Sequence, residues 1–417
     1  MARKSLLSDE KRMELMNIYR DNPAAAARDL LGIDLAPHQR VMLKSMWDCN
    51  NVITILSRGS GKCIKGDSMC LTDNGFYEIK DLHKTDKFGF NNDRINVFGE
   101  NGFKYATNTY KNKKEDIYSI TTSNGYSLDC VGKHKIRVIS NGEIIWKRAD
   151  EITKNDVVAI CRDSSYDFHG DYDWISEDEA YLIGALVSDG CFVKSSGVGF
   201  TNIDKDIVEK FENNYSLLGA HKFSEQKDKK EHSLLFGGKE KDDEFFKRYA
   251  IKRTKSTEKE IPVSILRSNK KALSSFLSGL FDTDGDVSGS RVSITQSSQK
   301  IIRQIHTCLL SFGIISTIRE RNVLYKGQQR KYFTIDITSY SRSLFYKEIG
   351  FKCKRKQDKL AETIRKNINP NKDTVKECWN LLLAIREELH KHIKFGYNNS
   401  KYRVFQVYRI KKYNYSY

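Results

Sequence analysis

The sequence predicts a multidomain α+β protein, in which an all-β module precedes a mixed α/β unit that occurs twice. Three observations support this fold class. The chain has 417 residues, enough for two to three domains. Short β-type segments alternate with Gly, Asn and Asp turns from residue 63 to about residue 160. A nonapeptide then occurs twice, in a region where helix, strands and helix repeat.

Composition excludes several classes of protein. Lys and Arg number 71 against 54 Asp and Glu, a formal net charge of +17, and hydrophobic residues make up 39%. That content builds packed cores, so general disorder is not expected. No apolar run approaches the roughly 18 residues of a membrane span, and the N-terminus lacks the apolar core of a signal peptide. We therefore expect neither a secreted nor a membrane protein.

The nine cysteines point to a reducing compartment. Their number is odd, and no two have the spacing C-x-x-C. A disulfide framework and a structural zinc site are therefore both poor fits. We expect the protein to reside in a reducing cytoplasm.

The first and last segments differ in character from the rest. Residues 1–62 read as a helix (24–31), a turn and a short strand (51–56) that leads into Ser-Arg-Gly-Ser-Gly-Lys. Residues 370–417 read as a helix (375–393) followed by a basic and aromatic stretch. From residue 352 to the end there are 17 Lys and Arg against 6 Asp and Glu, so +11 of the net charge lies there. Basic residues interleaved with aromatics favour nucleic acid as the partner over a merely solvated surface.

The repeated nonapeptide carries the chemistry. Residues 182–190 read LIGALVSDG and residues 277–285 read LSGLFDTDG, with Gly third, Asp eighth and Gly ninth in each. The match continues downstream, where Thr-Asn (201–202) corresponds to Thr-Gln (295–296), and where Gly219 corresponds to Gly313. One structural unit therefore occurs twice.

Helix packing would bring the two repeated aspartates together. Small residues at the third place let two helices approach closely, and Gly190 and Gly285 are expected to end those helices as C-cap glycines. Ser176 and Glu179 form a capping box at the start of the first helix. Adjacent carboxylates repel unless cations lie between them, and hard oxygens suit Mg²⁺. Asp189 and Asp284 thus predict a hydrolytic nuclease.

Residues 174–365 resemble the two-repeat LAGLIDADG homing endonucleases, and we place this domain at residues 166–369. The resemblance implies two αββαββα halves that present curved sheets to the major groove of DNA. It implies Asp189 and Asp284 as catalytic metal ligands, with Gly190 and Gly285 as further metal-binding positions. The sequence Ile-Gly-Phe-Lys-Cys-Lys-Arg-Lys (349–356) resembles a segment of the family. One of its lysines, Lys354 or Lys356, would lie beside the scissile phosphate. The alternative is that these lysines only contact the phosphate backbone.

Residues 63–165 resemble the opening module of an intein, which has an all-β, horseshoe-shaped Hint fold. Cys63 with Gly66 and Asp67 resembles the first splicing motif, and the segment around His134 resembles the second. Residues 146–158 resemble the segment that follows it, with Asp156 as a supporting position. Cys63 would attack the carbonyl of Lys62 to form a thioester, while His134 protonates the departing amide nitrogen. Val131 stands where the motif usually has Thr.

The junction before Cys63 resembles a Walker A loop cut after its lysine. Cys63 occupies the place of the Ser or Thr that would hold Mg²⁺, and splicing would restore that hydroxyl. The form of the loop is typical of the ATPase of viral terminase large subunits, and an upstream Leu-x-Pro-x-Gln segment supports this. ATP would bind only to the spliced terminase. The residues implied in nucleotide binding are Gln39, Arg58, Gly59, Gly61 and Lys62.

No His-Asn dipeptide occurs in the 417 residues, so the C-terminal splicing block is absent. The chain as written is expected not to splice alone, whereas its nuclease is nearly complete. The expected function is a Mg²⁺-dependent, monomeric homing endonuclease, active on double-stranded DNA of the uninterrupted terminase gene in the cytoplasm of an infected bacterial host. Two alternatives stay open. One is the N-terminal half of a split terminase intein, which would splice with a second chain. The other is a DNA-binding remnant that does not cleave.

Overall fold

The computed structural model describes residues 63–366, apart from 100–101, 113–114, 141–142, 193–196, 226–230 and 326, and a few isolated positions between 17 and 29. The expectations for residues 1–62, including the nucleotide-binding positions, and those for residues 370–417 therefore lie outside the described residues. Within the described part of the chain, no helix combines the length and apolar character needed to cross a membrane.

The first part of the described chain is an antiparallel β module. It contains a four-stranded sheet of order β2-β1-β4-β5, a three-stranded sheet of order β10-β9-β11, and the two-stranded pairs β3–β6 and β7–β8. The segments expected as turns fall between β1 and β2, β4 and β5, β7 and β8, and β9 and β10, and each of these pairs of strands is antiparallel. The strands are β1 (Met69–Thr72), β2 (Gly75–Glu78), β3 (Gly89–Asn91), β4 (Ile95–Gly99), β5 (Gly102–Ala106), β6 (Thr109–Lys111), β7 (Ile117–Thr121), β8 (Ser127–Val131), β9 (Lys135–Ser140), β10 (Glu143–Arg148) and β11 (Val157–Val158), with short helices α4 (Ile79–Leu82) and η1 (Ala149–Glu151).

Two α/β halves follow, and their element order is the same. The first half consists of α5 (Glu177–Asp189), β12 (Gly190–Cys191), β13 (Val198–Thr201), α6 (Lys205–Asn214), η2 (Tyr215–Leu218), β14 (Lys222–Glu225), β15 (Glu231–Leu235) and α7 (Lys239–Arg248). The short helices η3 (Ser256–Glu258) and α8 (Val263–Leu266) connect it to the second half.

The second half repeats this order and adds a final helix. It consists of α9 (Lys270–Asp284), β16 (Gly285–Ser288), β17 (Arg291–Gln296), α10 (Gln299–Leu310), β18 (Ser316–Tyr325), β19 (Gln328–Thr338), α11 (Tyr340–Glu348) and α12 (Lys354–Lys366). The sheet orders correspond, β12-β13-β15-β14 and β16-β17-β19-β18. The expected αββαββα arrangement of two halves is therefore confirmed.

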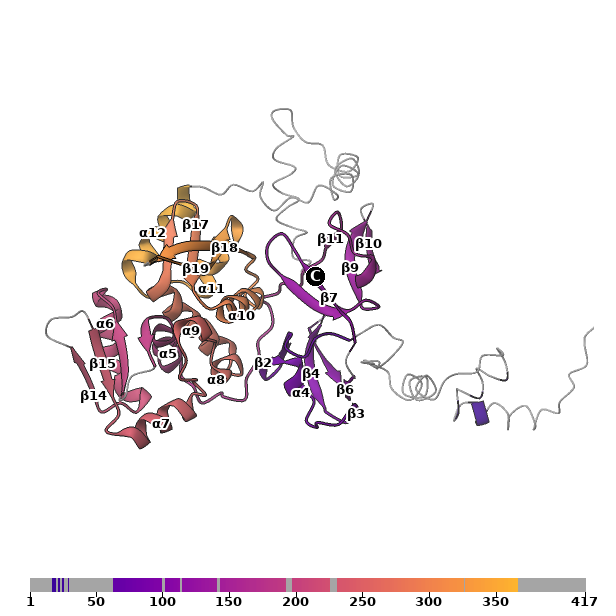
Figure 1. Cartoon of the computed structure of the whole chain (residues 1–417), viewed down its shortest axis with the longest axis horizontal. Coiled ribbons are helices and arrows are strands. Elements are labelled where there is room, and N and C mark those ends of the chain that lie inside the picture. Colours follow the sequence, from indigo (N-terminus) through magenta and orange to yellow (C-terminus); the bar gives the residue numbers. More distant parts are fainter. Residues whose placement is uncertain are drawn as a thin grey trace, which may run out of the picture.

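Helices α5 and α9 pack against each other at the centre of the two halves (Figure 1). A Cβ built on Gly184 would lie 2.1 Å from the carbonyl oxygen of Phe276, and one built on Gly279 would lie 2.1 Å from that of Tyr181. These contacts mirror each other across the two helices. Glycine at the third place of each nonapeptide therefore allows the backbones to touch, as the sequence predicted.

The glycines at the ninth place differ from the expectation. Gly190 and Gly285 do follow the last helical residues, but their φ angles are −80° and −83°, so neither is left-handed. The reason for glycine here is space. A Cβ would lie 2.1 Å from the carbonyl oxygen of Leu186 in the first case and 2.4 Å from that of Phe281 in the second. The capping box of Ser176 and Glu179 is present as expected.

The β module packs against the second half, next to α10 (Figure 1). The turn between β7 and β8 lies on the edge strand β18. The backbone N–H of Ile318 donates to the carbonyl of Asn124 at 3.0 Å, and that of Ser316 donates to the hydroxyl of Tyr126 at 3.2 Å. The Tyr126 ring also stacks on His306 with centroids 3.8 Å apart. The module thus covers part of an otherwise unpaired sheet edge.

Candidate functional site

The repeated aspartates lie together at the carboxyl ends of the two central helices. Asp189 is the last residue of α5 and Asp284 the last residue of α9. The hydroxyl of Ser188, next to Asp189, donates to the Asp284 carboxylate across the helix pair. The structure therefore brings together the two carboxylates that the sequence predicted as a pair.

Each carboxylate accepts a hydrogen bond from an amide side chain on its own half. Asn202 donates to Asp189 at 2.8 Å, and Gln296 donates to Asp284 at 2.5 Å. Asn202 follows the end of β13, and Gln296 is the last residue of β17. These are the residues that marked the downstream match of the repeat, so the two halves agree at the level of single hydrogen bonds.

The setting of Asp189 disfavours its charged form. Burial raises the pKa of this carboxyl, and the negative charge of Asp284 raises it further, to about 6. The hydrogen bond from Asn202 and the charges of Lys259 and Lys356 oppose the shift without cancelling it. The half-buried carboxylate of Asp189 and the exposed carboxylate of Asp284 beside it therefore form a site where a cation would be bound favourably.

Two buried lysines close the carboxyl ends of the helices. The Lys259 ammonium donates to the carbonyls of Ser188 and Gly190 at 2.8 and 3.0 Å. The Lys356 ammonium donates to the carbonyls of Asp282 and Gly285 at 2.5 and 2.6 Å. Burial lowers the pKa of both lysines. Cations at helix C-termini stabilise the partial negative charge of unpaired carbonyls, here beside the acidic pair.

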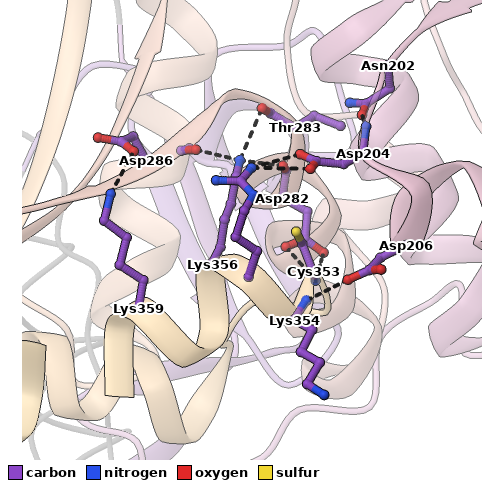
Figure 2. A network of polar contacts seen from close by, with 12 residues as sticks. Asn202, Asp204, Asp206, Asp282, Thr283, Asp286, Cys353, Lys354, Lys356 and Lys359 are labelled. Atoms are coloured by element: carbon purple, nitrogen blue, oxygen red, sulfur yellow. Dashed lines mark hydrogen bonds and ion pairs between the residues drawn. The ribbon is translucent and has the colours of Figure 1, made fainter. Parts of the chain in front are cut away.

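The two lysines proposed from the sequence have different positions. Figure 2 shows the Lys356 side chain extending toward the end of α9, whereas the side chain of Lys354 extends away from it. Lys354 uses its backbone N–H instead, donating to Asp206 at 2.8 Å. Of the two, Lys356 is the one held close to Asp284.

Asp282, at the sixth place of the second nonapeptide, holds the start of α12. Its carboxylate accepts from the backbone N–H of Cys353 at 3.1 Å (Figure 2). It also accepts from the backbone N–H of Lys352 at 3.0 Å and from the hydroxyl of Tyr181 at 2.8 Å. The first nonapeptide has the buried Val187 at this place. The acidic residue therefore has a positioning role in the second half, because it fixes the segment that leads to Lys356.

The donors at this site fit a hard divalent cation. Among the described residues there is no group of three His, Cys, Asp or Glu side chains arranged to hold a metal ion. The pair Asp189 and Asp284 would therefore need further oxygen ligands, which water and a phosphate group supply. The carbonyls of Gly190 and Gly285 each accept a lysine hydrogen bond, but a carbonyl oxygen has a second lone pair. Their role as metal ligands stays a prediction.

The backbone of Cys63 pairs with the end of the strand that leads to His134 in the β module. The carbonyl of Cys63 accepts the N–H of Val131 at 3.0 Å, and the carbonyl of Val131 accepts the N–H of His134 at 2.9 Å. An isolated bridge pairs Ile64 with Cys130 in β8. Burial raises the pKa of the Cys63 thiol, while a hydrogen bond from Asn112 lowers it. The structure thus joins two segments that lie about 70 residues apart in the sequence.

The supporting positions of this module have ordinary structural contacts. The carbonyl of Gly66 accepts the N–H of Lys80 at 2.8 Å, and Asp67 pairs with Lys65 at 2.8 Å. Asp156 accepts from Thr153 and pairs with Lys147 at 2.8 Å, and these contacts lower the pKa of its carboxyl. All three residues stabilise turns near the strands that flank Cys63 and His134.

Lys259 was not identified from the sequence, and the roles of Asn202 and Gln296 were not assigned. A signal for Lys259 does exist. It follows Asp189 by 70 residues, and Lys356 follows Asp284 by 72 residues. The repeat therefore extends to the lysines, but a single lysine in a basic chain gives no local motif by which to recognise it.

One family of known proteins matches part of the second half. Residues 271–350 match the family described as LAGLIDADG-like domain. This range includes α9 from its second residue, Asp284 and both long strands of the second sheet. Lys259 and Asp189 lie before the matched range.

Several curated proteins share sequence with most of the chain. The replication factor C small subunit of Methanocaldococcus jannaschii is 29% identical over 347 residues, which is 79% of this chain and 18% of that protein. The alpha subunit of ribonucleoside-diphosphate reductase NrdEB from Bacillus phage SPbeta is 24% identical over 300 residues, which is 63% of this chain and 26% of that protein. The probable phosphoenolpyruvate synthase of Methanocaldococcus jannaschii is 27% identical over 296 residues, which is 64% of this chain and 23% of that protein. The chain therefore spans less than a third of the length of each of these relatives.

Among solved structures, the homing endonuclease I-DmoI in complex with DNA and Mn is similar to this chain. It is 17% identical, the match covers 42% of this chain and 96% of that chain, and the TM-score is 0.31.

Proposed function

We propose that this protein is a Mg²⁺-dependent homing endonuclease that cuts double-stranded DNA at a specific site. The observation that carries this proposal is the symmetric arrangement of Asp189 and Asp284, each with its own amide donor and each beside a buried lysine. Two equivalent half-sites suit a substrate with two equivalent strands. The match of residues 271–350 to the LAGLIDADG-like domain supports the same proposal.

The residues of the site would have separate roles in phosphodiester hydrolysis. Asp189 and Asp284 would hold the cations, while Asn202 and Gln296 orient their carboxylates. Mg²⁺, when bound, would polarise the phosphate and lower the pKa of a water molecule. Lys259 and Lys356 add positive charge next to the acidic pair, where the transition state gains negative charge. Because one chain supplies both halves of the site, the nuclease would act as a monomer.

The open face of the second sheet is the proposed DNA surface. Strands β18 and β19 form a hairpin of 10 and 11 residues, about 34 Å long. That length corresponds to about one turn of B-form DNA, and the major groove admits a two-stranded β-ribbon. The net charge of +17 favours binding to the phosphate backbone.

We further propose that the nuclease is carried in an intein. The curated relatives have unrelated names, yet each shares a segment similar to this chain that makes up a minor part of its length. A mobile element inserted into unrelated host proteins accounts for that pattern. The proximity of Cys63 to the turn that contains His134 supports the same proposal.

The splicing chemistry would begin at the bond between Lys62 and Cys63. The Cys63 thiol loses its proton to water and its sulfur attacks the Lys62 carbonyl carbon, the peptide C–N bond breaks, and His134 supplies the proton that the amide nitrogen gains. A thioester and a free amine result. The host would be a terminase ATPase interrupted after its Walker A lysine, in a bacterial cell infected by a virus. ATP would then be a ligand of the spliced host only.

The test compares two DNA duplexes in Mg²⁺. One joins the codons for the residues before Cys63 directly to a Ser or Thr codon, as in an uninterrupted terminase gene, and the other contains the inserted sequence. We expect cutting of the first duplex and no cutting of the second. Cutting of both would contradict a homing function, and specific binding without cutting would favour the remnant instead.

The splicing reaction has a separate test. Incubation with a small thiol should cleave the chain between Lys62 and Cys63 by attack on the thioester, and Cys63→Ala should abolish this cleavage. An intact chain after prolonged thiol treatment would contradict the acyl shift at this junction.

A further inference from the structure

The open face of the second sheet contains a buried carboxylate between two arginines. Asp336 lies in β19 between Ile335 and Ile337, which face the core, so its side chain belongs to the opposite face. Its carboxylate is nevertheless only 1% exposed. The register pairs Asp336 with Ser293 on β17 and with Thr317 on β18, in the middle of the sheet.

The two arginines approach this carboxylate from both sides. The Nε atom of Arg319 lies 2.9 Å from one oxygen of Asp336, and the Nε atom of Arg291 lies 3.8 Å from the other. The arginine side chains are 52% and 38% exposed. Neither guanidinium group forms an ion pair with any other acid among the described residues, so both lie over Asp336 with donors left for a ligand.

The surroundings of the cluster are mostly polar, and the next acid in the same cross-strand row is Asp286 on β16, which pairs with Ser293 and lies 4.0 Å from Lys359. Ser293 and Thr317 flank Asp336, and Thr295 and Thr334 form a hydroxyl pair at 2.8 Å in the adjacent row. A buried acid that holds two arginines in place reduces the entropy they lose when they bind a ligand. Asp336 therefore has the properties of a positioning residue for Arg291 and Arg319.

We propose that Arg319, held by Asp336 with Arg291, reads a guanine in the half-site of DNA that the second half contacts. The inference rests on the proposed endonuclease function and deepens it. An arginine fork matches the O6 and N7 acceptors of guanine in the major groove, and it does so bidentately. Arg319 projects from a strand of the hairpin that has the length of one DNA turn. Asp336 acts through the arginines and needs no DNA contact of its own.

The opposite face of the same hairpin provides a matched control. Lys331 pairs with Glu320 at 2.7 Å, and both belong to the face that contains Phe333 rather than Asp336. The Lys331 side chain is 66% exposed. Lys331→Ala therefore removes one positive charge from the hairpin without affecting the arginine cluster.

The experiment selects bound duplexes from a randomised DNA pool, with the full chain and its variants in Ca²⁺. The wild type should enrich guanine at one or two positions of one half-site. Arg319→Ala should lower that preference about 10- to 100-fold and leave the other positions unchanged, since a good bidentate pair discriminates to this degree. Arg319→Lys should keep the affinity for bulk DNA and still lose the guanine preference, because an ammonium has no fork.

Asp336→Asn tests the positioning role. The preference for guanine at the same positions should weaken. The affinity for bulk DNA should stay equal or rise, because a negative charge is lost. Lys331→Ala should leave every position unchanged, and thermal melting confirms that each variant is folded. A wild type that selects a sequence which Arg319→Ala still selects would overturn this inference alone. A wild type that selects no sequence would overturn the site-specific endonuclease as well.

Discussion

At the residue scale, burial and the neighbouring charge of Asp284 disfavour the ionised form of the Asp189 carboxyl group when no cation is bound. Its folded pKa of about 6 exceeds the ordinary value of 3.8, so between these pH values the folded state binds more protons than the unfolded state. Stability without metal therefore falls as pH rises from about 4 to about 6, and it stays lower above that range. Function at this site is thus expected to reduce the stability of the metal-free protein.

Asp189→Asn should therefore melt at a higher temperature than the wild type at pH 7.5 in a chelator. Asparagine is neutral at every pH, so it removes both the buried charge and the repulsion from Asp284. The advantage should shrink toward pH 4, where the wild-type carboxyl is itself neutral. Thermal melting as a function of pH measures this, and an equal or lower melting temperature at pH 7.5 would contradict the assigned environment.

The two lysines of α12 give a second residue-scale prediction. Lys356→Met leaves the carbonyls of Asp282 and Gly285 without their buried donor, and this should cost about 1–3 kcal/mol of stability. Lys354→Met keeps the backbone contact with Asp206 and should stay within about 0.5 kcal/mol. Denaturant unfolding of the two variants, which lose the same charge from the same helix, compares them directly. Equal losses of stability in the two variants would show that the hydrogen bonds of Lys356 to the carbonyls at the end of α9 do not stabilise the protein.

How far the sequence predicts the site depends on whether the signal is local. Asp189 and Asp284 were predictable because each belongs to a nonapeptide that occurs twice. Asn202 and Gln296 were visible as a matched position, but only the folded sheet shows that both reach the carboxylates. Lys259 lies in an irregular segment 70 residues after Asp189, and nothing in its local sequence distinguishes it from the other lysines.

At the element scale, the contact between α5 and α9 determines how the halves meet. Gly184→Ala or Gly279→Ala would place a methyl group against a backbone carbonyl of the other helix, which no rotamer change can relieve. We expect each to destabilise the protein by about 3 kcal/mol or more, through forced separation of the helices. Lys271→Ala, at an exposed position of α9, is the matched control and should be nearly neutral. A glycine variant as stable as this control would contradict the close packing.

The turn between β7 and β8 gives a prediction about the sheet edge. Tyr126→Phe removes the acceptor for the N–H of Ser316, a residue that is 2% exposed, and should destabilise the second half by about 1–3 kcal/mol. Tyr118→Phe, on β7 and 46% exposed, serves as the control. Denaturant unfolding of the two variants gives the free energy of unfolding of each. The absence of any difference would mean that the module does not support β18.

The start of the first repeated helix at Ser176 and the ends of both repeated helices before Gly190 and Gly285 were predicted, because cap residues and the repeat agree there. The extended conformation of Gly190 and Gly285 was not predicted, because a helix-final glycine usually indicates a left-handed residue. The contact of the β7–β8 turn with β18 joins residues about 190 apart, and no local pattern encodes such a pairing.

At the scale of the whole molecule, the β module and the α/β halves share an interface. The change from turn-rich β segments to helical segments separates them in the sequence, yet Tyr126 and His306 stack across the boundary and Arg267 pairs with Asp81 at 2.8 Å. Burial lowers the pKa of His306 to about 4, so its ring is neutral at pH 7. The β module is therefore part of the structural support of the two α/β halves, in addition to its proposed splicing role.

The central claim is that Asp189 and Asp284 together cut DNA, and one measurement tests it most directly. A plasmid with the uninterrupted host junction is incubated with the wild type, Asp189→Asn or Asp284→Asn, in Mg²⁺ or in a chelator. We expect a linear product only for the wild type in Mg²⁺, with either substitution abolishing double-strand cutting. Cutting by both variants at the wild-type rate would contradict the assignment of these carboxylates.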